Sequence, residues 1–151
     1  MTKTMLDTID RHILSVLQRE GRISNLELAE RVGLSPTPCS RRVKRLEDTG
    51  VITGYGAKVN QAVLGHEVSV MINVRLAQQR PDDIKEFISA VHKLPEITEC
   101  LLVAGNLDYV LKVRAASVDA LKDFVLAKLK SICCVSETTT LLILETEKST
   151  D

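Results

Sequence analysis

The sequence predicts an α+β fold, in which an N-terminal winged helix-turn-helix precedes a ferredoxin-like βαββαβ domain. In the first 60 residues, apolar side chains recur at the spacing of amphipathic helices, whereas later segments alternate as half-buried strands do. Charge divides at the same place, because residues 1–60 hold ten basic and seven acidic side chains, a net charge of +3. Residues 61–151 hold ten and thirteen, a net charge of −3. We therefore expect one domain over residues 1–60, which includes a wing and linker, and a second over residues 61–151.

The composition is that of a folded protein. The chain has 151 residues, of which 44% are hydrophobic and 26% charged, so disorder along the whole chain is excluded. The total net charge of zero excludes a uniformly basic coat and leaves room for a local basic face. Only 3% of residues are aromatic and Trp is absent, which argues against stacking on single-stranded nucleic acid. No apolar run has the length of a membrane span, so we expect a cytoplasmic protein.

Two short helices are predicted before residue 34. Asp7 is a good N-cap for a helix that runs to Glu20, ahead of a glycine. A second helix begins with the capping-box pattern of Ser24 and Glu27, in which each side chain accepts a hydrogen bond from the other's backbone N–H. Gly33 ends this helix, because glycine adopts the left-handed conformation of a helix end at little cost.

A third helix is predicted from Pro36 to about Thr49, with Ser35 as its N-cap. The helix stops at Gly50, and residues 51–59 predict a small β-wing. Two helices joined by a glycine-containing turn, as the second and third are here, make a candidate helix-turn-helix.

The third helix carries the most informative pattern. Cys39, Val43 and Leu46 share one face, which we expect to be buried. The other sides carry polar and basic side chains, namely Thr37, Arg41, Arg42, Lys44 and Arg45. Such a helix can enter a major groove, where Arg reads guanine and Thr meets a base edge, whereas Lys44 and Arg45 could equally hold phosphates. The alternative is a solvated charged face on an ordinary surface helix.

The first domain also resembles a known family. The matching residues are Asp7-x-x-Asp10, Gly21-Arg22, Leu28-Ala29, Val32-Gly33-Leu34-Ser35, Pro38-Cys39, Arg41-Arg42, Arg45-Leu46-Glu47 and Gly50-Val51-Ile52. With them, residues 10–54 resemble the winged helix-turn-helix of the Lrp/AsnC, or feast/famine, transcriptional regulators. The resemblance implies sequence-specific binding of double-stranded DNA by a dimer. The residues expected to bind DNA are Ser35, Thr37, Pro38, Arg41, Arg42, Lys44 and Arg45.

The second domain has the pattern of a split βαβ fold. The predicted elements are a strand over residues 68–76, a helix from 81 to about 94, strands over 97–104 and 107–115, a helix capped by Ser117, and a strand over 138–146. In the helix capped by Ser117, the apolar side chains are Val118, Leu121, Phe124, Val125 and Leu129. The helices cover one face of the sheet, and we expect a dimer to form through the other. The alternative is that the polar side chains of that face meet only water.

This domain resembles the regulatory domain of the same family, often called RAM. The matching signature is Gly105-Asn106-Leu107-Asp108-Tyr109, the family's Gly-x-x-Asp-Tyr loop, which in the family lies between dimers and binds a free amino acid. Backbone N–H groups of a Gly-rich turn can hold a carboxylate, and Asp108 can pair with an ammonium group. The expected effector-site residues are Leu102, Ala104, Gly105, Asn106, Leu107, Asp108, Tyr109, Ser136, Thr138, Thr139 and Thr140.

Simpler explanations exist for parts of this signature. Gly105-Asn106 is also a common hairpin turn, and Tyr109 fits a core position. The family often has an acidic residue where Asn106 stands and an aromatic one where Leu107 stands, so the identity of the amino acid stays open.

Enzymatic and metal sites are not expected. His12, His66 and His92 lie in separate segments, and no phosphate-binding loop or nucleophile motif accompanies them. The four cysteines include no CxxC pair, so we expect reduced cysteines that mostly pack in the interior, no metal and no cofactor.

We therefore expect a transcriptional regulator at the nucleoid whose assembly and DNA binding respond to a free amino acid. Its expected partners are double-stranded DNA, the amino acid and further copies of the chain, as a dimer and in higher assemblies such as an octamer, and no membrane. One alternative is an architectural DNA-binding protein without an effector. Another is an amino-acid-binding regulatory subunit of a metabolic enzyme. The basic third helix argues against this second alternative.

Overall fold

The computed structural model describes residues 5–148 and divides the chain into two compact units. The first unit ends at Lys58 and the second begins at Val59, two residues before the boundary expected from charge and periodicity. Each unit has a hydrophobic core of its own. Among the described residues, no helix is long and apolar enough to span a membrane.

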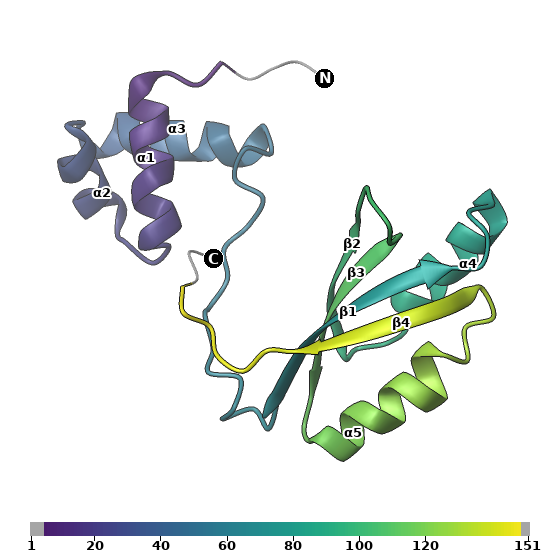
Figure 1. Cartoon of the computed structure of the whole chain (residues 1–151). Helices are drawn as coiled ribbons and strands as arrows, with labels where there is room; N and C mark the ends of the chain where they lie inside the picture. Colours follow the sequence, from purple (N-terminus) through teal and green to yellow (C-terminus); the bar gives the residue numbers. More distant parts are fainter. Residues whose placement is uncertain (1–4, 149–151) are drawn as a thin grey trace. The chain divides into compact units, whose positions relative to one another are not determined.

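The first unit consists of three helices, α1 (Thr8–Arg19), α2 (Asn25–Val32) and α3 (Pro36–Asp48), and Figure 1 shows them at its N-terminal end. Both predicted helix starts are confirmed. Asp7 caps α1 and Ser24 caps α2, each with a reciprocal capping box. Gly33 has the predicted left-handed conformation, with φ of 72°. The core of this unit consists of Ile13, Leu28, Ala29, Val32, Cys39 and Leu46, so the predicted inner face of α3 is buried.

One expectation for this unit is wrong. Residues 51–59 contain no strand, so the β-wing does not form. A two-stranded hairpin has little stability without a further strand to pair with, and Gly54 and Gly56 weaken this one further. Ser35 is the N-cap of α3, as predicted, although its side chain makes no capping hydrogen bond.

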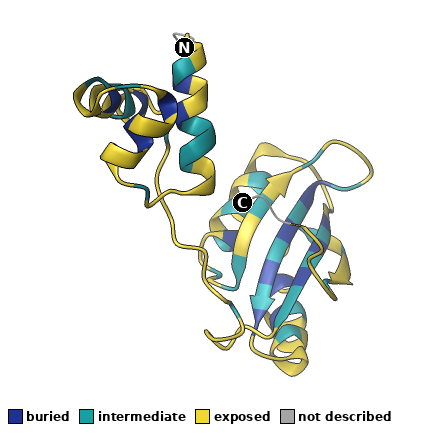
Figure 2. Ribbon diagram, turned by 90° about the vertical axis from the view of Figure 1, so that its left-hand side faces the viewer, coloured by how far each residue is buried: buried dark blue, intermediate teal, exposed yellow. Residues whose placement is uncertain are grey.

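The second unit is a four-stranded sheet with helices on one face. Its strands are β1 (Val68–Leu76), β2 (Ile97–Leu102), β3 (Tyr109–Ala115) and β4 (Val135–Leu142), and its helices are α4 (Pro81–Val91), α5 (Val118–Asp123) and the π-helix η1 (Phe124–Leu129). The strand order is β2-β3-β1-β4, and all neighbours are antiparallel. This is the predicted ferredoxin-like topology. Figure 2 shows the sheet with its helices behind it.

The core of the second unit lies between the sheet and its helices. Alternate residues of β1 and β3 are buried, as the periodicity predicts, among them Val70, Ile72 and Val74. From α4, Phe87 is fully buried and its ring lies 4.7 Å from that of Tyr109. Tyr109 is therefore a core residue, as expected.

Four strand boundaries in this unit differ from the sequence-based expectation. β2 ends at Leu102 and β3 begins at Tyr109, so a loop of six residues replaces the expected Gly105-Asn106 hairpin turn. β4 lies several residues earlier than predicted, because its extent is set by pairing with β1 from Leu76 to Val70.

The predicted helix after Ser117 is an α-helix only in its first part, α5. It continues as a π-helix, in which buried Phe124 and Leu129 are five residues apart, and the 3.6-residue period fails there. Val118, in the first turn, is exposed rather than part of the buried face.

Candidate DNA-binding and effector sites

One exposed side of α3 presents a continuous polar and basic surface. Thr37, Ser40, Arg41 and Lys44 follow each other on successive turns and, with Asn25 and Pro36, line a shallow depression of about 390 Å³. Arg41 and Lys44 make no ion pair with any residue between 5 and 148. These two cations are therefore available to a nucleic acid, and Thr37 lies beside them.

Two contributors to this surface were not expected from the sequence. Ser40 lies one turn after Thr37, so helical spacing alone could have found it. Asn25 belongs to α2, and its Nδ2 donates a hydrogen bond of 2.9 Å to the backbone oxygen of Pro36. The packing of α2 against α3 brings Asn25 there, and no local pattern signals it.

Arg42 and Arg45 behave differently from Arg41 and Lys44. Arg45 Nη2 lies 2.5 Å from Asp10 Oδ2, and Arg42 Nη1 lies 2.9 Å from Asp10 Oδ1. Arg42 Nη1 also lies 2.6 Å from Asp7 Oδ2. The structure thus separates the predicted DNA-binding cations into two unpaired side chains and two that bind the start of α1.

The remaining predicted DNA-binding residues lie at the start of α3. Ser35 is exposed and Pro38 is half-buried, and neither lines the depression beside Arg41.

The loop after β2 forms one wall of a cavity of about 260 Å³ in the second unit. Of the predicted effector residues, it is lined by Leu102, Ala104, Gly105, Leu107, Asp108 and Tyr109. Leu76, Gln79, Ile84 and Val103 complete the lining. Most of these residues are apolar, but polar and apolar atoms contribute about equally to the walls, the polar ones including the carboxylate of Asp108 and the amide of Gln79. Such a cavity suits a small molecule that has an apolar side chain and a cationic end.

Asp108 accepts hydrogen bonds from two other residues that line this cavity. It is buried, and its Oδ2 accepts a hydrogen bond of 2.7 Å from the backbone N–H of Leu76. Its Oδ1 accepts a short hydrogen bond from Gln79 Nε2. Each carboxylate oxygen can accept more than one hydrogen bond, so these contacts leave capacity for an ammonium group. The role of Gln79 depends on tertiary packing and was not predicted.

The other predicted effector residues do not line the cavity. Asn106 lies in the same loop, but its backbone oxygen accepts hydrogen bonds from the guanidinium of Arg75. Ser136 Oγ donates a hydrogen bond of 3.0 Å to the backbone oxygen of Arg75. The threonines belong to β4, where Thr138, Thr139 and Thr140 pair with β1. Within the described part of one chain, the structure therefore does not bring these hydroxyl groups to the cavity.

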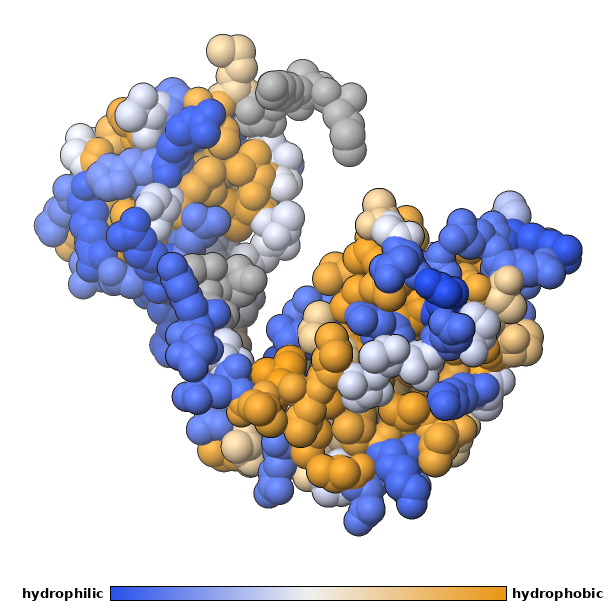
Figure 3. All heavy atoms as spheres, viewed as in Figure 1, coloured by the Kyte–Doolittle hydropathy of each residue, from blue (hydrophilic) through white to orange (hydrophobic). Residues whose placement is uncertain are grey.

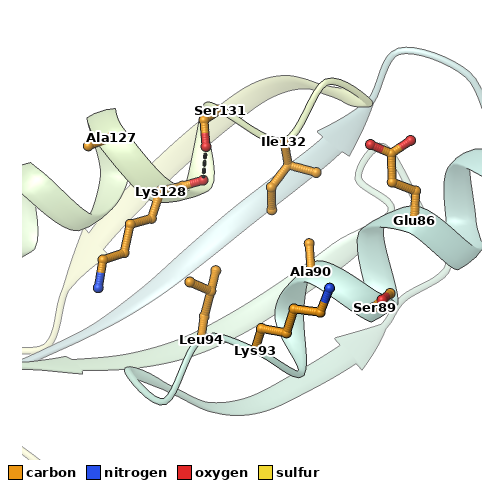
Figure 4. A pocket seen from close by; sticks show the side chains of 9 residues that line it. All are labelled: Glu86, Ser89, Ala90, Lys93, Leu94, Ala127, Lys128, Ser131 and Ile132. Atoms are coloured by element: carbon orange, nitrogen blue, oxygen red, sulfur yellow. Dashed lines mark hydrogen bonds between the residues drawn. The ribbon is translucent and has the colours of Figure 1, made fainter.

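A larger cavity, of about 490 Å³, lies between α4 and η1 on the helix side of the second unit (Figure 4). Its floor is apolar, and Glu86, Lys93 and Lys128 stand around it. Lys128 forms an ion pair with Glu96, and its amino group points away from Glu86. The charged groups do not converge on one point, so this cavity lacks the arrangement that recognition of a small polar ligand requires.

The four cysteines are free thiols, of which Cys39 and Cys134 are buried, Cys100 is half-buried and Cys133 is exposed. Burial raises the pKa of Cys39, which lies in the core of the first unit, so its reactive thiolate form is disfavoured. No group of three or more His, Cys, Asp or Glu side chains within residues 5–148 is arranged to hold a metal ion.

Both units match known protein families. Residues 6–53 match winged helix-turn-helix DNA-binding domains, and residues 69–151 match the Lrp/AsnC ligand binding domain. The chain is 45% identical to the leucine-responsive regulatory protein of Klebsiella pneumoniae over 97% of this chain and 89% of that protein. It is 44% identical to the protein of the same name from Escherichia coli K12, with the same coverage.

Solved structures agree with these sequence matches. A transcriptional regulator from Neisseria meningitidis, in complex with L-methionine, superposes with a TM-score of 0.92 at 36% identity, covering 96% of this chain and 94% of that one. A feast or famine regulatory protein from M. tuberculosis, also complexed with L-methionine, superposes with a TM-score of 0.87 at 37% identity, covering 96% of both chains.

Proposed function

The chain belongs to the Lrp/AsnC family of DNA-binding transcriptional regulators, and from that premise we propose that α3 reads its operator while a free amino acid in the cavity beside Asp108 controls DNA binding. The amino acid enters the cavity of the second unit, and α3 belongs to the first. A protein that acts in this way on the chromosome works in the cytoplasm, at the nucleoid. Its activity is regulatory and not enzymatic.

The unpaired cations of α3 carry the DNA-binding part of this proposal. Arg41 and Lys44 project from the second helix of the helix-turn-helix, on the side away from buried Cys39 and Leu46. In this motif the second helix enters the major groove. Arg41 has the donors needed for the O6 and N7 acceptors of guanine, and Thr37 reaches a neighbouring base edge. Lys44 holds a phosphate, together with the exposed N-terminus of α3 at Ser35.

The lining of the cavity supports an apolar amino acid as effector. Leu76, Ile84, Leu102 and Leu107 offer an apolar environment to its side chain, and Asp108 receives its ammonium group. The backbone N–H groups around Gly105 are the donors for its carboxylate. Relatives named leucine-responsive and structural neighbours bound to L-methionine support the same class of ligand.

The face of the sheet without helices is the proposed dimer interface. Met71 lies directly opposite Leu141 on this face, and Leu101 lies opposite Val110. Leu101 and Leu141 are exposed in the single chain, and Figure 3 shows apolar side chains spread over the second unit. Burial of such a surface against a second copy stabilises a dimer by the hydrophobic effect. Further association of dimers, up to an octamer, would bring Ser136 and Thr138–Thr140 of a neighbouring chain to the effector site.

A thermal-melt screen against the common free amino acids tests the effector part of the proposal. A ligand at about 100 times its dissociation constant stabilises the folded protein by about 2.7 kcal/mol per site. We expect leucine, methionine or another apolar amino acid to raise the Tm. The absence of a shift with every amino acid would favour a DNA-binding protein without an effector, provided that duplex binding is retained.

A further inference from the structure

A buried carboxylate lies between two arginines of the DNA-binding helix. Asp10 is 1% exposed, and its two oxygens contact different guanidinium groups, Oδ1 that of Arg42 and Oδ2 that of Arg45. Both arginines belong to α3, whereas Asp10 lies in the first turn of α1. The contact therefore joins two helices whose sequence positions are more than 30 residues apart.

The first turn of α1 is built to present this carboxylate. Asp7 Oδ1 accepts a hydrogen bond of 2.7 Å from the backbone N–H of Asp10, and Asp10 Oδ2 accepts one of 3.2 Å from the backbone N–H of Asp7. The capping box fixes both side chains, and Asp7 also binds Arg42. Two carboxylates thus face two guanidinium groups, and half of the basic side chains of α3 are neutralised within the protein.

We propose that Asp10 is a positioning and specificity-determining residue, which keeps Arg45 and Arg42 from DNA phosphates so that α3 engages DNA through Arg41 and Lys44. Phosphate contacts strengthen binding to every sequence equally, whereas contacts with base edges distinguish one sequence from another. An internal partner for two of the four cations therefore lowers nonspecific affinity more than it lowers specific affinity. This inference rests on the proposed binding of duplex DNA by α3.

The two arginines differ in what would follow from loss of the Asp10 charge. Arg42 is 29% exposed and would keep Asp7 as a partner. Arg45 is 45% exposed and has no other carboxylate among the described ion pairs. The substitution Asp10→Asn preserves the shape of the side chain and removes the charge that faces both arginines, and it leaves only Arg45 without a carboxylate partner.

Salt-dependent binding of the full-length protein measures this release. Binding to a random-sequence duplex and to a duplex selected by the wild-type protein is titrated over a range of KCl concentrations. Each phosphate contact adds about −0.9 to the slope of log K against log salt concentration. We expect Asp10→Asn to steepen the slope by about one per bound protomer, to tighten binding to the random duplex and to lower the specificity ratio. Adding Arg45→Ala to Asp10→Asn should return the slope to its wild-type value.

A matched control is available in the same unit. Glu20 forms an ion pair of 2.5 Å with Arg31, so Glu20→Gln releases a guanidinium group that belongs to α2 rather than to α3. Its salt slope should equal that of the wild type. Equal steepening in both variants would overturn the assignment, because it would reflect net charge rather than the place of Asp10.

An unchanged slope in folded Asp10→Asn would overturn the inference and leave the proposed function standing. If Asp10→Asn does not fold, Arg45→Ala in the otherwise wild-type chain decides, since an already paired Arg45 predicts an unchanged slope. A slope that falls by about one in Arg45→Ala would show that Arg45 holds a phosphate, which also overturns the inference. Wild-type protein without duplex affinity would overturn the proposed function itself.

Discussion

The carboxylate of Asp108 accepts a hydrogen bond of 2.7 Å from the backbone N–H of Leu76, and this contact joins the loop after β2 to the end of β1. Both residues line the cavity proposed for the effector. The sequence suggests Asp108 only as a ligand contact, but Asp108 therefore has a structural role as well. Substitutions at position 108 must separate the two roles.

Asp108→Ala should destabilise the second unit and abolish the response to an amino acid. Loss of the acceptor leaves the N–H of Leu76 buried without a partner, which costs about 1–3 kcal/mol. Asp108→Asn keeps an oxygen for Leu76 and removes the charge, so it should retain most of the stability and still lose the response. Urea unfolding and amino-acid-induced shifts in Tm measure the two effects. A stable, fully responsive Asp108→Ala protein would contradict both roles.

Arg41→Ala should weaken binding to a selected operator duplex by about 1–3 kcal/mol and relax sequence preference at one base pair. The reason is the loss of bidentate hydrogen bonds to guanine. Fluorescence anisotropy with operator duplexes changed at single base pairs measures both effects. Arg31→Ala is the control, because Arg31 pairs with Glu20 and lies outside α3. Unchanged sequence preference in Arg41→Ala would remove this side chain from base readout.

Leu141→Glu should weaken the dimer. Leu141 is 52% exposed on the helix-free face of the sheet, opposite Met71, and a buried charge there would lack a partner. Leu126 is 55% exposed but belongs to η1, on the other side of the unit, so Leu126→Glu should leave association unchanged. Sedimentation velocity over a range of protein concentrations compares the two variants. Equal association of both with the wild type would place the interface elsewhere.

The thiol of Cys133 should react slowly for an exposed cysteine. Its Sγ lies 2.8 Å from Glu86 Oε1, and the hydrogen bond to this carboxylate raises the pKa of the thiol. Glu86→Gln should lower that pKa, which leaves more thiolate at a given pH and speeds alkylation by iodoacetamide. The pH at the midpoint of the rate profile measures the change, with Glu137→Gln as a control. A midpoint that does not move, or moves upward, would contradict the assignment.

The sequence predicted the fold well where local signals and packing agree. Asp7, Ser24 and Gly33 mark helix ends through hydrogen bonds or conformations within a few residues of each position. The alternation of Val70, Ile72 and Val74 likewise reports directly that one face of β1 is buried. Errors arose where long-range pairing decides, as at the ends of β4, or where the helical period changes, as at Phe124 in η1.

The candidate sites were predictable in part for the same reason. Helical spacing identified the polar side of α3, including Thr37 and Arg41. It could not show that Asp10, from another helix, binds Arg45, or that Gln79 reaches Asp108. Those contacts depend on how the chain folds back on itself, which periodicity does not encode.

The coupling between amino acid and DNA is the central claim, and one titration tests it directly. Binding of the full-length protein to a selected duplex is measured with and without the amino acid that raises its Tm. The account predicts a changed Kd for DNA, and an equal factor when DNA is present and the amino acid is titrated, because coupling between two binding sites is reciprocal. Superimposable DNA-binding curves, with the amino acid bound at saturation, would contradict it.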